Sequence, residues 1–398
     1  MTFSKISASS LRAILEYTRG RERAILRLLR ELVEIESPSN DKAAVDRCGA
    51  RVAKEWRKRG GDVRILRNAK RGDIVRAEIS PASHAPASRA HAKVRGQIMI
   101  LGHLDTVYPI GTLAKMPFRI SGGRAWGPAT FDMKGGLALA LFAVDALRAT
   151  RVPFGRKLVF LWTGDEEIGS DASRRAIAAE ARRSDSVLVL EPPYGIDGRA
   201  KTRRKGIGEL VLEIHGRAAH AGINPEEGVN AAHELAFQMA RLIKMNDPRR
   251  GITVQVNVIS SGTGANVVPD FARAEVDVRF AHAADAKALE KKLLSLRPVI
   301  KGARIVVRGG MNRPPLERTF AVEALFYHAR GIARELGFEL GEASTGGGSD
   351  GSLTAAMGVP TLDGMGAVGD GAHSPREFVF VRALTQRAAL IAGLLATL

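Results

Sequence analysis

The sequence predicts an α/β protein with a mixed, largely parallel sheet and helices on both faces, interrupted by a smaller α+β unit. Three observations support this prediction. Short apolar runs alternate with helical segments in the first half of the chain, as in proteins with parallel strands. Near residue 206 the pattern changes to alternating, half-exposed strands. After residue 320 a helix, a loop, a strand and a final helix resemble the first half again.

The first half contains recognisable helices and buried strands. Apolar residues recur at helical spacing, and continuous apolar runs indicate strands that are buried on both faces. The predicted helices span residues 21–35, 43–58, 136–150 and 173–181, and the predicted strands span residues 97–101, 157–162 and 186–190. Residues 81–91 are rich in Pro, Ala and Ser and predict an exposed loop.

The middle of the chain predicts a compact unit with the element order βαββαβ. Its strands are expected at residues 209–215, 252–259, 272–280 and 304–308, and its helices at 228–244 and 284–296. A helix from 320, a strand at 359–362 and a last helix from 381 then complete the first domain. We therefore predict one discontinuous domain, residues 1–205 and 316–398, and an inserted domain, residues 206–315.

Composition excludes several classes of function. The chain has 398 residues and a net charge of +18, which favours anionic partners. The charge is scattered and aromatic residues make up only 5%, so we expect no nucleic-acid binding. No apolar run has the roughly 18 residues of a membrane span and no signal peptide is recognisable, which predicts a cytoplasmic protein without membrane contact. The single cysteine, Cys48, predicts a buried structural thiol rather than a disulfide.

Acids and histidines follow the predicted strands. Sites in open α/β sheets form beyond the carboxyl ends of the strands, so these positions are the first to inspect. The residues at such strand ends or at a helix start are His103, Asp132, Glu167, Glu191 and His373. Each alone has an ordinary structural explanation, such as a helix cap for Asp132. Together they would lie along one rim of one sheet.

Imidazole and carboxylate ligands without cysteine are typical of a catalytic zinc site. Five such ligands suit two ions better than one, because one carboxylate can bridge the ions and leave each an open position for water. Two ions about 3.5–4 Å apart can activate this water and stabilise an oxyanion. We therefore predict two Zn²⁺ ions per subunit, with Co²⁺ or Mn²⁺ as substitutes.

Two further acids lie next to the predicted ligands. Asp105 would share a face of the extended chain with His103 and could orient its imidazole, although it could also cap the turn. Glu166 precedes Glu167 and does not need to bind a metal. We predict that Glu166 is the general base, which takes a proton from water and passes it to the leaving nitrogen.

These motifs resemble a known family in order along nearly the whole chain. They are His103-Leu104-Asp105-Thr106-Val107, Asp132-Met133-Lys134-Gly135-Gly136, Asp165-Glu166-Glu167-Ile168-Gly169, His220-Ala221-Gly222 and the late His373. The family is the co-catalytic zinc metallopeptidases and deacylases of bacterial glutamate carboxypeptidase, acetylornithine deacetylase, succinyl-diaminopimelate desuccinylase and aminoacylase. The resemblance implies a zinc-exopeptidase-like catalytic domain with an inserted lid and dimerisation domain, and hence a homodimer.

The resemblance also implies individual roles for the ligands. Asp132 would bridge the two zinc ions, His103 and Glu191 would complete one site, and Glu167 and His373 would complete the other. By the same resemblance, Glu166 would be the general base and Asp105 would support the metal ligands.

Substrate contacts are implied more weakly. His220 resembles a histidine that reaches across the dimer to the substrate carbonyl, and Asn266 and Arg279 resemble positions that hold the substrate. Arginine suits a carboxylate because its planar fork can bond both oxygens. Either Arg279 or Arg313 could be this anchor, and each could instead form a surface salt bridge. Gly347 lies in a glycine-rich segment similar to the glutamate carboxypeptidase branch.

Two alternatives remain beside a carboxypeptidase that releases a C-terminal or N-acylated amino acid from a small, carboxylate-bearing substrate. Glu191 is similar to the carboxypeptidase branch, whereas Met133 resembles the deacetylases and is compatible with an N-acyl amino acid deacylase. The turn Pro128-Ala129-Thr130 departs from the carboxypeptidase pattern and leaves the branch open. The chain could also be a silent, metal-dependent binding relative, but the complete set of ligands and base argues against this.

Overall fold

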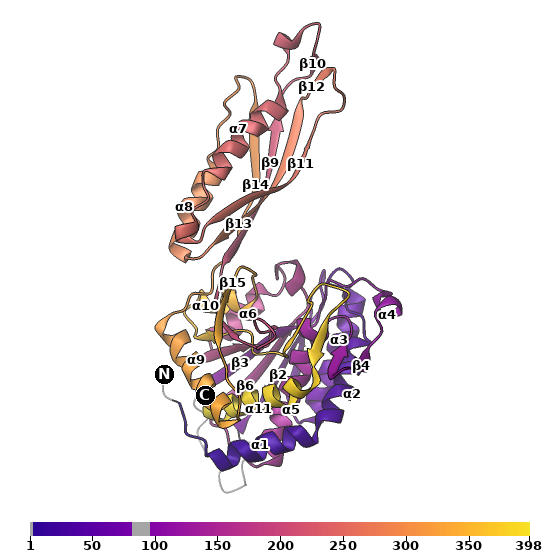
Figure 1. Cartoon of the computed structure of the whole chain (residues 1–398), viewed down its shortest axis with the longest axis vertical. Coiled ribbons are helices and arrows are strands. Elements are labelled where there is room, and N and C mark those ends of the chain that lie inside the picture. Colours follow the sequence, from indigo (N-terminus) through magenta and orange to yellow (C-terminus); the bar gives the residue numbers. More distant parts are fainter. Residues whose placement is uncertain (1–2, 82–95) are drawn as a thin grey trace. The chain divides into compact units, whose positions relative to one another are not determined.

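The computed structural model describes residues 3–81 and 96–398, which form two compact units (Figure 1). Unit 1 comprises Met1–Arg203, Arg318–Thr345 and Ser349–Leu398, and unit 2 comprises Arg204–Glu317 and Gly346–Gly348. The sequence places the boundaries at 206 and 315 and does not assign the three glycines to the inserted unit. Most of the predicted loop at 81–91 lies outside the described residues.

Unit 1 is built on a mixed sheet. Among the described residues this sheet has six strands, in the order β1-β2-β6-β3-β7-β16. The strands are β1 (Asp62–Leu66), β2 (Ile74–Ile79), β6 (Lys157–Thr163), β3 (Gln97–His103), β7 (Ser186–Val189) and β16 (Thr361–Leu362). β6, β3, β7 and β16 run parallel, while β1 and β2 are antiparallel to their neighbours. The strands predicted to be followed by site residues, β3, β6 and β7, belong to this parallel part.

Helices cover both faces of this sheet. Alternate residues of β3 pack in opposite directions: Ile98 and Ile100 belong to one apolar cluster, and Met99 and Leu101 belong to another. The first cluster also contains side chains from α1 (Ala8–Gly20), α2 (Glu22–Val33), α3 (Lys42–Lys58), α5 (Gly135–Ala149), α9 (Phe320–Glu335) and α11 (Val381–Thr397). The second contains side chains from α6 (Arg174–Ala181) and α10 (Gly351–Ala355).

Smaller elements complete unit 1. One antiparallel sheet joins β17 (Gly369–Asp370), β18 (Phe378–Phe380), β5 (Arg124–Trp126) and β4 (Arg119–Ser121), and a second joins β15 (Glu342–Thr345) to β8 (Ala200–Arg204). The short helix α4 spans Thr112–Lys115. Cys48 is fully buried in α3, and burial raises the pKa of its thiol, as expected for a structural cysteine.

Helix α1 and strands β1 and β2 were not predicted from the sequence. Helix α1 begins where the Ser7 side chain accepts a hydrogen bond from the Ser10 amide, and it buries only a narrow apolar stripe. Strand β2 carries Arg76 within its buried part, where the guanidinium pairs with Glu180 of α6 at 2.8 Å. A charged residue at a core position hides a strand from a pattern of hydrophobicity, because its burial is tolerable only with charged partners. Here these are Glu180 and, at 2.9 Å, Glu78 of the same strand.

Unit 2 contains the element order β9-α7-β11-β13-α8-β14. These elements are β9 (Gly206–His215), α7 (Ala231–Ile243), β11 (Thr253–Ser261), β13 (Phe271–Phe280), α8 (Ala283–Leu294) and β14 (Arg304–Arg313). The strands form an antiparallel sheet in the order β11-β13-β9-β14, and both helices pack on one face of it (Figure 1). A small ladder of β10 (Ala219–His220) and β12 (Val267–Val268) lies at one end of the unit.

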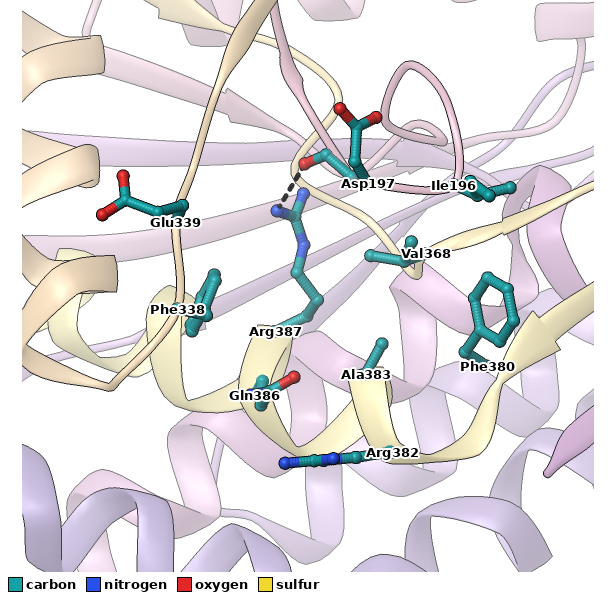
Figure 2. Close-up of a pocket in the computed structure, with 11 residues that line it drawn as sticks. Ile196, Asp197, Phe338, Glu339, Val368, Phe380, Arg382, Ala383, Gln386 and Arg387 are labelled. Carbon is teal, nitrogen blue, oxygen red and sulfur yellow. Dashed lines mark hydrogen bonds between the residues drawn. The ribbon is translucent and has the colours of Figure 1, made fainter.

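A cavity of about 380 Å³ lies beside α11 in unit 1 (Figure 2). Phe338 contributes to its apolar wall, and the Arg387 guanidinium beside it donates to the backbone carbonyl oxygens of Gly366, Gly198 and Gly364. These bonds tie α11 to two loops, so we assign Arg387 a structural role. None of the described residues lining this cavity belongs to the predicted metal set. Among the described helices, none is long and apolar enough to cross a membrane.

Candidate metal centre

Three parallel strands bring three of the predicted ligands to one edge of the sheet. His103 is the last residue of β3, Glu167 lies in a 3₁₀ turn shortly after β6, and Glu191 follows β7 by two residues. β3 pairs with both β6 and β7 in parallel register, so the carboxyl ends of all three strands meet. This is where open α/β sheets place their sites.

The other two predicted ligands come from loops of unit 1. Asp132 does not open the helix as the sequence suggests: α5 begins only at Gly135, and Asp132 has extended backbone angles (φ −116°, ψ 94°) in the preceding turn. His373 follows β17 and has a positive φ of 60°. Both side chains reach the strand-end residues from outside the main sheet.

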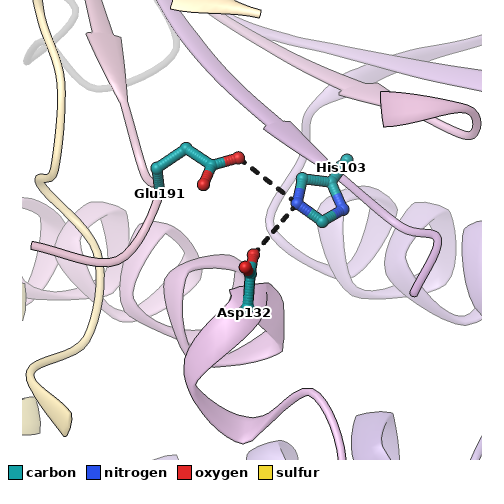
Figure 3. Close-up of side chains that lie close together, drawn as sticks. All are labelled: His103, Asp132 and Glu191. Carbon is teal, nitrogen blue, oxygen red and sulfur yellow. Dashed lines mark ion pairs between the residues drawn. The ribbon is translucent and has the colours of Figure 1, made fainter. Parts of the chain in front are cut away.

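The five side chains form two clusters that share Asp132. In one cluster, His103 Nε2 lies 3.3 Å from Asp132 Oδ1 and 3.3 Å from Glu191 Oε1 (Figure 3). In the other, His373 Nε2 lies 3.4 Å from Asp132 Oδ2 and 3.2 Å from Glu167 Oε2. The ligand atoms within each cluster are no more than 4.8 Å apart. Asp132 therefore turns one carboxylate oxygen toward each cluster.

The side chains in these clusters are better suited to binding metal ions than to hydrogen bonding with each other. Among the described residues, His103 Nε2, Asp132 Oδ1 and Glu167 Oε1 are buried and have no hydrogen-bond partner. Buried polar atoms are normally satisfied, so these three unsatisfied atoms, each from a different predicted ligand, fit a bound cation. Burial alone would lower the pKa of His103, but the carboxylates of Asp132 and Glu191 raise it well above its usual value. The negative charge at this edge thus attracts positive charge, and the donor set fits zinc.

Asp105 supports the centre differently from the sequence argument. The oxygen nearest His103 Nδ1 is the backbone carbonyl of Asp105, at 2.9 Å, whereas the closest carboxylate oxygen lies 3.6 Å away. The buried Asp105 carboxylate instead accepts hydrogen bonds from the amides of Glu166 and Glu167, both at 3.2 Å, and from Ser39 Oγ at 2.7 Å. The residue therefore holds both His103 and the Glu166–Glu167 turn, each through a different group.

Glu166 lies beside the clusters without belonging to either. It is half-buried and starts the 3₁₀ turn that also carries Glu167. Since the Asp105 carboxylate fixes the amide of Glu166, the backbone of this residue is held in place next to the predicted ligand Glu167. This position is compatible with the predicted role of a general base.

Glu377, a buried carboxylate next to the centre, was not predicted from the sequence. It accepts hydrogen bonds from the backbone amides of Phe131 and Asp132, both at 2.8 Å. Its position four residues after His373 was the available signal, but an acid in a loop carries no pattern of its own. Only the fold brings this loop against the Asp132 turn.

The predicted substrate-binding residues all lie in unit 2, in two groups. His220 and Asn266 belong to the β10–β12 end of the unit, where the Asn266 carbonyl accepts a hydrogen bond from the Ala221 amide at 2.9 Å. The His220 ring accepts a hydrogen bond from the Gly222 amide at 3.2 Å. These two residues are therefore neighbours, on a part of the unit that contains no member of the metal clusters.

The second group contains Arg279, Arg313 and Gly347. The Arg279 guanidinium forms an ion pair with Asp277 at 2.7 Å and donates to the Gly346 carbonyl at 3.2 Å, so its fork already has a carboxylate partner. Arg313 is 4% exposed and lies on β14, and the Gly347 carbonyl accepts from Arg204 at 3.0 Å. The choice between the two arginines as a substrate anchor therefore stays open.

Comparisons with known proteins agree on one family. The model of peptidase family M20/M25/M40 matches residues 99–397. Carboxypeptidase G2 from Pseudomonas sp. (strain RS-16) is 30% identical over 382 residues, which cover 94% of this chain and 88% of the relative. The succinyl-diaminopimelate desuccinylase of Dechloromonas aromatica is 31% identical over 315 residues, covering 73% of this chain and 80% of the relative.

Solved structures share the fold. The aminopeptidase PepT from Bacillus cereus superposes with a TM-score of 0.75 at 21% identity, covering 94% of this chain and 98% of the other. An M20 family metallo-carboxypeptidase from Sulfolobus solfataricus superposes with a TM-score of 0.71 at 18% identity, covering 94% and 98%. At these identities the likeness concerns the mixed α/β fold alone.

Proposed function

Because this chain belongs to peptidase family M20/M25/M40, we propose that it is a two-zinc hydrolase that cleaves an amide bond next to a free carboxylate. Family membership makes the chain a metal-dependent hydrolase of the metallopeptidase and deacylase type. The number of ions and the class of substrate are the parts that we propose.

The observation that carries the proposal is the shared carboxylate of Asp132. One of its oxygens lies 3.3 Å from His103 Nε2 and the other 3.4 Å from His373 Nε2. Each histidine also has a second carboxylate, from Glu191 or Glu167, within 3.3 Å. A carboxylate that faces two such ligand pairs is suited to bridge two ions, which supports a dinuclear centre.

The chain's own residues would carry the proton transfers. Zinc, when bound, supplies Lewis acidity that activates water and polarises a carbonyl oxygen. Glu166 takes a proton from the attacking water as the new C–O bond forms. It then passes this proton to the leaving nitrogen as the C–N bond breaks. The Asp105 carboxylate accepts from the amides of Glu166 and Glu167 and thereby holds the backbone of both residues in place during both transfers.

The substrate class proposed first is a C-terminal or N-acylated amino acid, with glutamate as the preferred released residue. Support comes from the similarity to carboxypeptidase G2 over 94% of this chain. The substrate carboxylate would bind an arginine of unit 2. Either Arg279, which pairs with Asp277 at 2.7 Å, or the buried Arg313 could be this anchor, because a guanidinium fork can bond both carboxylate oxygens.

The second candidate is an N-acyl amino acid deacylase. One specific observation favours it: Met133, not an acid, follows Asp132 and is 1% exposed, with its sulfur 3.2 Å from the His103 amide nitrogen. The similarity to succinyl-diaminopimelate desuccinylase over 73% of this chain agrees with this candidate. Both candidates share the same centre and differ in the acyl group that is removed.

We also propose a homodimer that forms through unit 2. Strand β11 is an edge strand of its sheet, and Val258 and Ile259 on this strand are 48% and 50% exposed. An exposed apolar edge strand is a site for pairing with a second copy. His220 would then contribute to the substrate site of the partner. Sedimentation equilibrium of the native protein and of Val258→Lys should give a dimer and a monomer, respectively.

The test is amino-acid release from a panel of peptide and N-acyl substrates that end in Glu, Asp, Ala, Met or ornithine. Native protein, Glu166→Gln and the control Glu339→Gln would be assayed before chelation, after chelation and after zinc is returned. Glu339 is a suitable control because its side chain is 76% exposed and pairs only with Arg334 among the described residues.

We expect release to require zinc, to vanish in Glu166→Gln and to persist in Glu339→Gln. The preferred substrate then distinguishes a carboxypeptidase from a deacylase. If all three proteins bind two ions and none releases an amino acid, the catalytic proposal is wrong. The chain would then be a metal-dependent binding protein.

A further inference from the structure

The Glu377 carboxylate is surrounded by hydrogen-bond donors from the turn that carries Asp132. Its Oε1 accepts from the backbone amides of Phe131 and Asp132, both at 2.8 Å. Its Oε2 accepts from the backbone amide of Ala129 at 3.0 Å and from the Tyr108 hydroxyl at 2.5 Å. Glu377 itself is 0% exposed. Both oxygens of this buried carboxylate are therefore used by one short stretch of backbone and one hydroxyl.

This arrangement offsets part of the cost of burial, which still raises the pKa of Glu377. An isolated buried carboxylate costs several kcal/mol, and charge-assisted hydrogen bonds are about twice as strong as neutral ones. Four donors are close to the full capacity of a carboxylate. The backbone that supplies them has no regular secondary structure at Asp132, where φ and ψ are not helical. Glu377 thus replaces the hydrogen bonds that a helix or strand would have given this turn.

The same contacts connect the turn to the loop that carries His373. Glu377 lies four residues after His373, and the amide of Glu377 donates to the Ser374 carbonyl at 3.3 Å. The Tyr108 hydroxyl also lies 3.0 Å from the carbonyl oxygen of Ser374. Asp132 and His373 come from distant parts of the chain, yet the Asp132 turn and the loop that carries His373 are joined through the Glu377 carboxylate, and the Tyr108 phenol contacts both Glu377 and Ser374.

We propose that Glu377, supported by Tyr108, is a positioning residue that sets the Asp132 carboxylate between the two clusters and holds His373 at its distance from it. This inference rests on the proposed two-metal function. Glu377 contacts neither substrate nor the reacting atoms. It acts through the Asp132 backbone, whose side chain must direct one oxygen to each ion.

The decisive experiment measures metal binding rather than activity. Metal-free protein would be titrated with Zn²⁺ against a chromophoric chelator, and Co²⁺ absorption spectra would report the ligand geometry. Glu377→Gln puts an amide NH₂ group against at least one donor of the turn. Partners of metal ligands typically contribute about 10- to 100-fold to metal affinity, so we expect a loss of this size and an altered Co²⁺ spectrum. Tyr108→Phe removes one donor of four and should cause a smaller loss.

Glu234→Gln is the matched control. Glu234 is also 0% exposed and accepts hydrogen bonds from the backbone amides of Val299 and Ile300, but it lies in unit 2. It should lower stability to urea in the same way as Glu377→Gln while leaving zinc affinity and the Co²⁺ spectrum unchanged. A loss of metal affinity only in the Glu377 and Tyr108 variants separates positioning from a general effect on stability.

Three results would contradict us in distinguishable ways. If native protein binds fewer than two ions per subunit, both the proposed two-zinc function and this inference are wrong. If native protein binds two ions and Glu377→Gln binds them with the same affinity and spectrum, the positioning role alone is wrong. If Glu377→Gln does not fold, unchanged metal binding by Tyr108→Phe overturns the inference.

Discussion

Replacing Asp105 with asparagine should impair catalysis while sparing the metal ions. In the native protein the two carboxylate oxygens accept separately from the amides of Glu166 and Glu167, both at 3.2 Å, and one also accepts from Ser39 Oγ at 2.7 Å. The Asp105 backbone carbonyl accepts the hydrogen bond from His103 Nδ1 at 2.9 Å, and the substitution leaves this contact intact.

The size of the effect follows from counting acceptors. An asparagine amide offers one oxygen where aspartate offers two, so at least one of the two turn amides must face an NH₂ group whichever way the side chain turns. A buried donor left without an acceptor costs about 1–3 kcal/mol. If the turn relaxes by this amount before Glu166 can act, kcat/KM should fall roughly 5- to 150-fold, since about 1.4 kcal/mol corresponds to a factor of ten.

The assay combines kcat/KM with zinc content and zinc affinity for native protein, Asp105→Asn and Ser39→Ala. Ser39→Ala removes one donor to the carboxylate and leaves both turn amides bonded, so its rate should fall less than that of Asp105→Asn. Zinc content should stay native in both. A 10- to 100-fold loss of zinc affinity in Asp105→Asn with a proportional loss of activity would refute this reasoning, because the carboxylate would then act on His103.

Three further predictions concern stability and the packing around the centre. Burial lowers the pKa of His328 to about 4, so the folded state binds fewer protons than the unfolded state, and the free energy of unfolding falls as the pH drops from about 6.5 toward 4. After a discount for partial exposure, we expect urea titrations to show a loss of about 1 kcal/mol between pH 7.5 and pH 5. His328→Gln should show no such loss. Ile100→Ala in the centre of β3 should lower the free energy of unfolding by about 2–5 kcal/mol in the same assay, and a change below 1 kcal/mol would contradict its burial. In Gly136→Ala the new methyl group would overlap the backbone carbonyl oxygen of Leu190, and metal titration should show weaker zinc binding. In Gly331→Ala, in α9, the new methyl group has no neighbouring atom within contact distance, and calorimetry should show a stabilisation of about 0.5–1 kcal/mol.

The parts of the fold that could be predicted are those in which burial and hydrophobicity coincide. β3, β6 and β7 are buried along nearly their whole length, and their apolar runs stand out in the sequence. β2 is equally buried but contains Arg76, which pairs with its neighbour Glu78 and also with the buried, distant Glu180. Pairing of this kind depends on residues about a hundred positions apart, so local patterns cannot reveal it.

Some features of the metal centre could likewise be predicted from the sequence, whereas others depend on tertiary packing. The sequence by itself predicted the types of ligand and placed three of them, His103, Glu167 and Glu191, after parallel strands, because the edge where a strand ends follows from local pattern and topology. The tertiary structure alone decided that Asp132 turns one oxygen to each histidine and that Asp105 holds His103 through its carbonyl. It also brought Glu377 beneath the Asp132 turn. These features depend on distances of a few ångströms between segments far apart in the chain, and such distances are set by packing rather than by any local run of residues.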